Sequence, residues 1–277
     1  MKNKMEFNEI KVSSMVFIFA VVFFIGFATL IPIIYILGWD AAYELSGIIN
    51  LLMNILLCSM LIRRLDISKS GIIFLYNDFR HKVKFIEIFF IIIFEVCIAI
   101  GSTCILSYII CSRSPTLLID FFEEFSPCFL STNGYIICFF ITVIIWPIID
   151  EIVFRRTIFK KITEKFNIYV GMIVSTLIST SLQIGGGVVG IFVIGMINCI
   201  LYRKYNNIFI LILTHSISTL IFISFLGNFV INISKLNILT SKDILSSFYI
   251  GILFIFIGVI MLIIYINKNK IYLKENL

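Results

Sequence analysis

The sequence contains few charged residues, and this scarcity excludes the ordinary soluble globular class. Only 14% of the 277 residues are Asp, Glu, Lys or Arg, whereas 60% are hydrophobic and the mean hydropathy is +1.10. A soluble domain typically has about 25% charged residues. The chain is therefore predicted to be an integral membrane protein.

Histidines and paired cysteines are also scarce, which leaves little material for a metal centre. There are two histidines, His81 in a basic segment and His215 alone in an apolar run. None of the seven cysteines forms a C-x-x-C pair and most lie in apolar runs, so we interpret them as buried, inert thiols. Cys111 and Cys128 flank the one long outer loop, and the sequence leaves their pairing open.

Basic residues are nearly absent from one set of loops. All of the 22 lysines and arginines except Arg113, Lys235 and Lys242 fall in segments that alternate membrane spans would leave on one side. Loops rich in Lys and Arg face the cytoplasm. Both termini are therefore predicted to be cytoplasmic. Because topology explains the net charge of +6, no nucleic-acid partner is expected.

Long apolar runs make up most of the chain. A membrane-spanning helix needs about 20 apolar residues, and a single segment in lipid must be helical to satisfy its own backbone. We predict an all-α, polytopic helical bundle in one domain, residues 1–277, with an amphipathic piece on the membrane surface at 63–84. About eight spans fit the apolar runs: 15–37, 45–62, 86–110, 130–150, 168–185, 188–202, 208–226 and 246–266.

Two adjacent acids, Asp150 and Glu151, stand at the end of one apolar run, just after Pro147. An ionised side chain inside a bilayer costs about 2.5–3.5 kcal/mol, so charge at this depth is a functional-site hypothesis. On a helix, Glu151 and Arg155 are four residues apart in the order that favours an ion pair. A structural ion pair at the inner membrane edge explains this stretch equally well.

His215 is a second polar outlier, with Thr219 one helical turn later on the same side. A histidine in such a run is either a packed, hydrogen-bonded residue or a catalyst, and the acidic stretch elsewhere in the chain favours the catalyst. Glu95, inside the third predicted span, is left open between a functional and a packing residue.

Three stretches, in this order and spacing, resemble the conserved half of the CAAX protease and bacteriocin-processing family. The similarity covers about residues 130–225. It implies an intramembrane endopeptidase of the glutamate or metal-assisted type, in a family that includes type II CAAX prenyl endopeptidases and bacteriocin-immunity proteins. The stretches are Asp150-Glu151-x-x-x-Arg155, the run from Phe192 to Arg203, and the run from Leu213 to Thr219.

Glu151, Arg155 and His215 match the pattern of this family, and three other positions depart from it. The resemblance implies that the first glutamate and first histidine activate a water, with or without a metal, while a second histidine and an asparagine support the oxyanion. The departures are Asp150 for the first glutamate, Gln183 for the first histidine and Thr219 for the asparagine.

These departures fall on the implied chemistry. Gln183 can donate a hydrogen bond but cannot titrate, and its amide is a poor zinc ligand beside imidazole. A divalent metal such as zinc is therefore poorly supported as a cofactor. If the protein is an active enzyme, we expect Asp150 or Glu151 to be the base and His215 with Thr219 to support the oxyanion.

The sequence thus predicts a multi-pass protein of a bacterial cell membrane with a polar cavity that opens to the cytoplasm. The expected partner is a peptide or protein embedded in the lipid bilayer. Two functions stay open: a membrane endopeptidase of full or weak activity, and a non-catalytic partner in bacteriocin self-immunity or regulation of a membrane protein. The residues expected to line the cavity are Asp150, Glu151, Arg155, Gln183 and His215.

Overall fold

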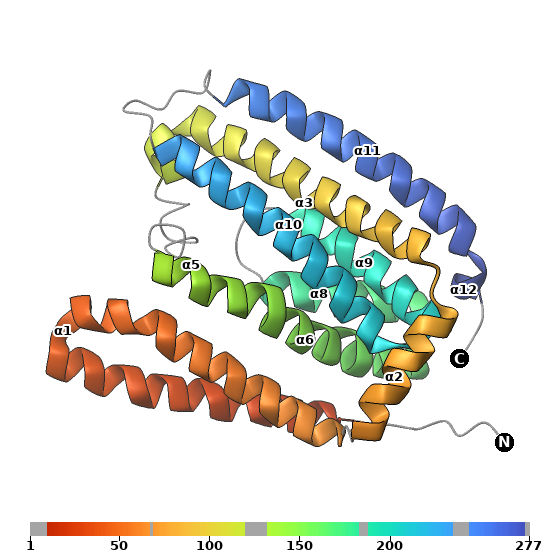
Figure 1. Ribbon diagram of the computed structural model, residues 1–277, viewed down its shortest axis with the longest axis horizontal. Coiled ribbons are helices and arrows are strands. Elements are labelled where there is room, and N and C mark those ends of the chain that lie inside the picture. The colour runs from red at the N-terminus through yellow and green to blue at the C-terminus, as the bar shows by residue number, and fades with distance from the viewer. Residues whose placement is uncertain (1–9, 67–68, 120–131, 183–187, 235–243, 275–277) are drawn as a thin grey trace.

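The computed structural model describes residues 10–66, 69–119, 132–182, 188–234 and 244–274. Within these ranges the regular structure is helical and contains no strand, which confirms the predicted all-α bundle (Figure 1). The protein is a multi-pass membrane protein. Seven helical stretches of the described chain are long and apolar enough to cross a membrane: Val12–Ile36, Leu45–Leu65, Phe85–Arg113, Tyr135–Lys165, Val188–Tyr205, Ile208–Asn228 and Leu245–Asn269.

Helix α1, Val12–Leu65, is a hairpin of two antiparallel arms (Figure 1). The chain turns at Gly38, which has φ 84° and ψ 173°. Side chains other than glycine rarely tolerate a positive φ of this kind. The arms Val12–Ile36 and Leu45–Leu65 correspond to the first two predicted spans.

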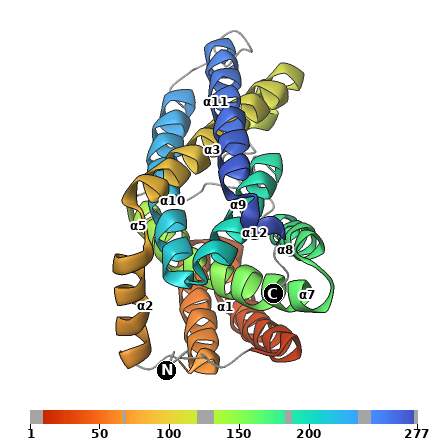
Figure 2. The same ribbon diagram turned by 90° about the vertical axis from the view of Figure 1, so that its right-hand side faces the viewer.

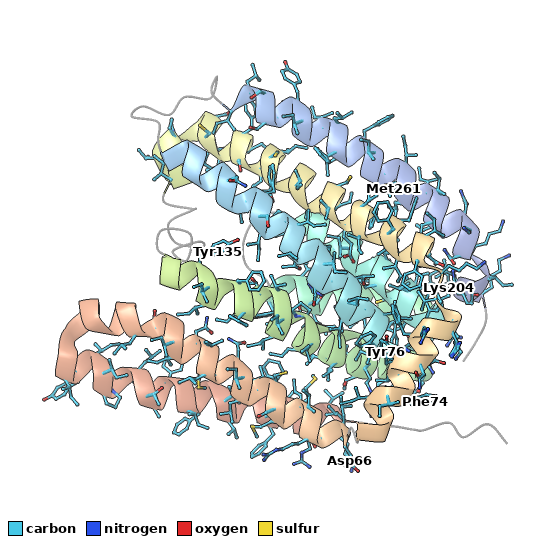
Figure 3. The ribbon with its side chains drawn as sticks, viewed as in Figure 1. Asp66, Phe74, Tyr76, Tyr135, Lys204 and Met261 are labelled. Carbon is cyan, nitrogen blue, oxygen red and sulfur yellow. The ribbon has the colours of Figure 1, made fainter. Side chains whose placement is uncertain are left out.

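Helix α2, Lys69–Lys82, crosses one end of the bundle. Most of the segment predicted to be amphipathic is therefore helical. This helix exposes the apolar side chains Ile72, Ile73 and Phe74 (Figure 3). The start of α1, the helix α7 (Lys160–Lys165) and the short α12 (Ile271–Lys274) lie at the same end (Figure 2). The basic segments of the chain therefore gather at this end, which the charge distribution predicts to face the cytoplasm.

Helices α3, Phe85–Arg113, and α11, Leu245–Asn269, lie side by side. They meet through glycines: a Cβ added to Gly101 would lie 3.0 Å from the Gly251 carbonyl oxygen. Small residues of this kind allow membrane helices to approach closely. This contact fixes the position of α3, which carries Glu95.

The fourth predicted span is part of a longer helical run that passes through the centre of the bundle. Its segments are α5 (Thr132–Phe139), η2 (Phe140–Ile145), α6 (Trp146–Asp150), η3 (Glu151–Phe159) and α7. The segments η2 and η3 are π-helical, a form that frequently occurs at functional sites. The helical run continues past Asp150, as expected from the i, i+4 spacing of Glu151 and Arg155, and neighbouring helices bury these two charges.

Three helices complete the bundle: α8 (Ile168–Leu182), α9 (Val188–Tyr205) and α10 (Ile208–Ser234). Helix α8 has 15 residues, or about 22 Å at 1.5 Å per residue, so its described part is shorter than the membrane's hydrocarbon core of about 30 Å. It corresponds to the predicted span 168–185 and is not among the seven long helices.

Two apolar clusters surround the central run. One joins α3, α9, α10 and α11, and the other packs α1 against Ile149, Ile152 and Val153. The central helix thus turns its apolar face to α1 and presents Glu151 and Arg155 to α9 and α10.

Candidate active site

The candidate site is centred on a contact between Glu151 of η3 and His215 of α10. Nδ1 of His215 lies 3.1 Å from Oε1 of Glu151. The Glu151 side chain is 0% exposed, whereas that of His215 is 23% exposed. Because the carboxylate accepts from the Nδ1–H group, the other ring nitrogen, Nε2, stays available to a second partner.

The second oxygen of Glu151 faces a cation on the same helix. Arg155 Nε lies 3.5 Å from Glu151 Oε2, and neither atom has a hydrogen-bond partner among the described residues. This is a charge contact between two buried side chains, in the i, i+4 arrangement that the sequence predicted. An arginine in the interior is costly unless it is paired, so Glu151 and Arg155 each require the other.

Asp150 is also buried in the site. It interacts electrostatically with both Arg155 and His215. Thr219 is half-buried on α10, one turn beyond His215. Gln183 and Cys128 lie outside the described residues. The role of Gln183 therefore stays a prediction, and the pairing of Cys111 with Cys128 stays open.

Glu95 enters the site from α3, where the sequence had left its role open. Its side chain is 2% exposed. The Ser218 hydroxyl donates a hydrogen bond of 2.5 Å to Glu95 Oε2 and also lies 3.1 Å from the backbone oxygen of His215. Glu95 interacts electrostatically with both His215 and Glu151. The structure thus adds a carboxylate to the predicted set.

Asn198 of α9 is a site neighbour that the sequence analysis missed. Its side chain is 1% exposed and interacts electrostatically with Glu95. The signal available for it was a single amide inside the apolar run 188–202. An amide in an apolar run predicts a polar group inside a membrane span, but it does not predict which helix the Asn198 side chain faces.

A close approach of α8 and α9 lets Arg155 fit beside them. A Cβ added to Gly195 would lie 2.6 Å from Thr176 Cγ2 and 3.1 Å from Arg155 Nη2. Gly195 belongs to one of the stretches that carry the family resemblance. Its missing side chain provides the space that the guanidinium and the Thr176 methyl occupy.

A metal centre does not fit the donors of this site. Among the residues described here, no three His, Cys, Asp or Glu side chains are grouped so that they could hold a metal ion. Both oxygens of Glu151 face His215 and Arg155, and Nδ1 of His215 faces Glu151.

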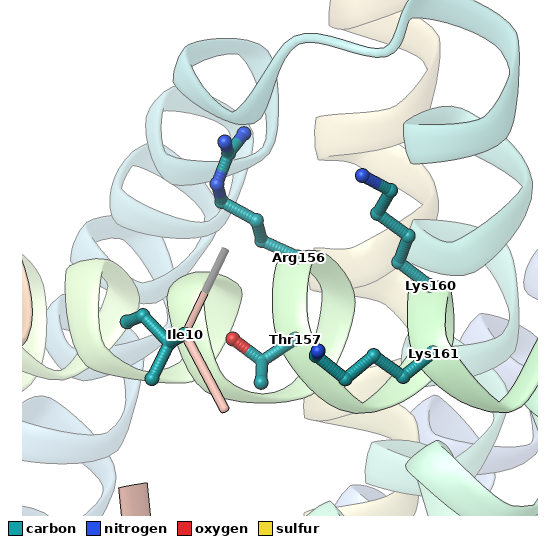
Figure 4. A pocket seen from close by; sticks show the side chains of 5 residues that line it. All are labelled: Ile10, Arg156, Thr157, Lys160 and Lys161. Carbon is teal, nitrogen blue, oxygen red and sulfur yellow. The ribbon is translucent and has the colours of Figure 1, made fainter. Parts of the chain in front are cut away.

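A small pocket at the end of the central run is lined by other residues than these buried acids (Figure 4). Its lining is basic, and the acids of the site do not contribute to it. Arg156, Lys160 and Lys161 at the end of the central run supply this charge, which is expected where a membrane helix meets the cytoplasmic face. The lining residues are Ile10, Arg156, Thr157, Lys160 and Lys161.

Comparison with known proteins identifies the segment that contains most of this site. Residues 132–221 match the family described as type II CAAX prenyl endopeptidase Rce1-like. No curated protein and no solved structure matches the chain. The matched segment contains Asp150, Glu151, Arg155 and His215, whereas Glu95 lies before it. Residues 132–221 are thus an Rce1-like segment, and the resemblance to the CAAX protease and bacteriocin-processing family is confirmed.

Proposed function

We propose that the protein is a membrane endopeptidase that cleaves peptides or protein segments held at the membrane. The observation that carries this proposal is the contact of 3.1 Å between His215 Nδ1 and Glu151 Oε1. Both residues match the family pattern, and both lie in the Rce1-like segment. The contact joins them inside the bundle.

In this proposal the three residues have different roles in peptide hydrolysis. Glu151 orients His215 through Nδ1, and Arg155 balances the charge of Glu151. His215 is the most accessible of the three side chains. When its ring is protonated on both nitrogens, Nδ1–H donates to Glu151 and Nε2–H can donate to the oxygen that becomes negative in the transition state. Glu151 contacts His215 through Oε1 and faces Arg155 through Oε2, so in this proposal another carboxylate of the site accepts the proton of the attacking water.

The experiment that tests this function is cleavage of a quenched membrane-peptide library by the purified protein in detergent. Glu151→Ala and His215→Ala should each lower turnover per folded molecule by about 100-fold or more, the range for loss of an oxyanion donor. Glu164→Gln is the matched control, because Glu164 lies on the same helical run but is 42% exposed. Unaltered cleavage by Glu151→Ala would remove this site from consideration.

A second candidate function is a non-catalytic partner that holds a peptide or membrane protein in the same site. Asp150, Gln183 and Thr219 favour it, because they replace the groups to which the family assigns chemistry. The decisive variant carries Asp150→Glu, Gln183→His and Thr219→Asn together. An inactive wild type with an active triple variant would show a binding protein on an intact protease scaffold. An active wild type would exclude this candidate.

A further inference from the structure

Glu95 and Asn198 carry hydrogen-bonding groups that no described residue satisfies. Glu95 Oε1 has no hydrogen-bond partner, and neither Oδ1 nor Nδ2 of Asn198 has one. Both side chains are almost fully buried. The other oxygen of Glu95 is held by Ser218 at 2.5 Å, so the carboxylate has one fixed oxygen and one available oxygen.

Buried groups of this kind require a partner. A buried polar group without a hydrogen bond costs about 1–3 kcal/mol, and native proteins usually satisfy such groups with an ordered water or a ligand. The Asn198 amide is a hydrogen-bonding neighbour of the Glu95 carboxyl, but it is not close enough to satisfy Oε1 of Glu95 or its own two polar atoms. A water can donate to both side-chain oxygens, and buried waters make about three hydrogen bonds of this type.

This pair lies next to the candidate catalytic histidine. Ser218, which holds Glu95, is three residues after His215 on α10 and also contacts the His215 backbone oxygen. Glu95 interacts electrostatically with His215 and Glu151. The unsatisfied groups of α3 and α9 therefore belong to the same polar centre as the Glu151–His215 contact.

We propose that Glu95 and Asn198 form the water-binding half of the active site, and that Glu95 is the base. This inference rests on the proposed endopeptidase function. As the water oxygen bonds to the peptide carbonyl carbon, Glu95 accepts one of the water protons, and the Nε2–H of the protonated His215 ring donates a hydrogen bond to the developing oxyanion. The carbon–nitrogen bond then breaks, and the proton passes from Glu95 to the leaving amine. The products are a new carboxyl terminus and a new amino terminus.

Glu95 is better placed for this role than the other two acids. Oε1 of Glu151 contacts His215 and Oε2 is in a charge contact with Arg155, so a proton on Glu151 would weaken both contacts. Asp150 interacts electrostatically with the same two partners. Glu95 lies outside the matched segment 132–221, so the family pattern does not assign it a role. In the family pattern a glutamate and a histidine activate the water, and this sequence has Asp150 and Gln183 at those positions. Glu95 supplies a further carboxylate for that task.

The test compares kcat and KM of the full-length protein and its variants on one cleaved peptide from the library. Glu95→Gln keeps a side-chain oxygen that can accept from Ser218 but removes the base. We expect it to lower kcat by about 100-fold or more, the range of general-base catalysis, with KM changed by less than about threefold. Asn198→Ala should lower kcat less, and Glu95→Asp should retain part of it. Glu164→Gln serves again as the control that leaves kcat unchanged.

A merely structural role of Glu95 predicts a different result. In that case Glu95→Gln would lower the melting temperature while kcat of the folded fraction stayed within about threefold of wild type. Such a result, together with an inactive Glu151→Ala variant, overturns this inference and leaves the proposed function in place. If the wild type cleaves no peptide, the proposed function fails and the inference falls with it.

Discussion

The Glu151 carboxylate and the His215 imidazole are 64 positions apart in the chain and 3.1 Å apart in the fold. Their contact joins the π-helical segment η3 to α10. Because the carboxylate fixes the ring through Nδ1, the direction of Nε2 depends on Glu151. The two residues therefore act as one unit, and a change in either should disable the same function.

The first prediction concerns this unit. Glu151→Gln and His215→Gln should each lower kcat/KM by about 100- to 1000-fold, and the double variant should be no worse than the more impaired single variant. Effects of residues that act together are strongly non-additive. The measurement is a double-mutant cycle on one cleaved peptide. Losses that multiply in the double variant would show that the two residues act independently.

The second prediction concerns the charge balance at Arg155. Arg155→Met should lower the free energy of unfolding by about 3–5 kcal/mol, because it leaves the buried Glu151 without its cation. Adding Glu151→Gln to this variant should recover part of the loss. Denaturant titration in detergent measures both changes. A double variant no more stable than Arg155→Met would mean that Glu151 does not depend on Arg155.

The membrane helices could be predicted from the sequence because apolar length is a local property. The predicted span 86–110 corresponds to α3, Phe85–Arg113, and the span 246–266 to α11, Leu245–Asn269. The predicted span 130–150 is part of a longer helical stretch, Tyr135–Lys165. Charges after Asp150 suggested the membrane edge, but Glu151 and Arg155 are buried by helices that are distant in sequence.

The candidate site could be predicted only where its residues form motifs. Glu151, Arg155 and His215 belong to motifs, and the structure places them in contact. Glu95 accepts a hydrogen bond from Ser218, which is 123 positions away in the chain. The sequence around these two residues contains no motif that predicts their contact. Local sequence shows that a polar group is in a span, but only the packing of the helices shows which group it faces.

The third prediction uses the space at Gly195. Gly195→Ala should destabilise the protein by about 1–3 kcal/mol, the usual cost of overpacking, and lower turnover, because the new Cβ would lie 2.6 Å from Thr176 Cγ2 and 3.1 Å from Arg155 Nη2. Thr176→Ser removes that methyl group. The double variant should therefore regain stability, as measured by thermal unfolding in detergent. Without this recovery, the contact with Thr176 would not explain the loss.

The last prediction concerns a polar network at the end of the bundle that carries the basic segments. Lys204 Nζ lies 2.6 Å from Glu87 Oε1 and 3.0 Å from Asn269 Oδ1, and the Tyr205 hydroxyl donates to Glu87 at 2.6 Å (Figure 3). These contacts join α3, α9 and α11.

Lys204→Met should lower the free energy of unfolding by about 3–5 kcal/mol, because it leaves the buried Glu87 without its cation. Adding Glu87→Gln should recover part of this stability. Turnover per folded molecule should stay within about threefold of wild type, since the network contains none of the residues proposed for catalysis. A large loss of kcat in the folded fraction would contradict this separation and would show that the end network controls the position of Glu95 on α3.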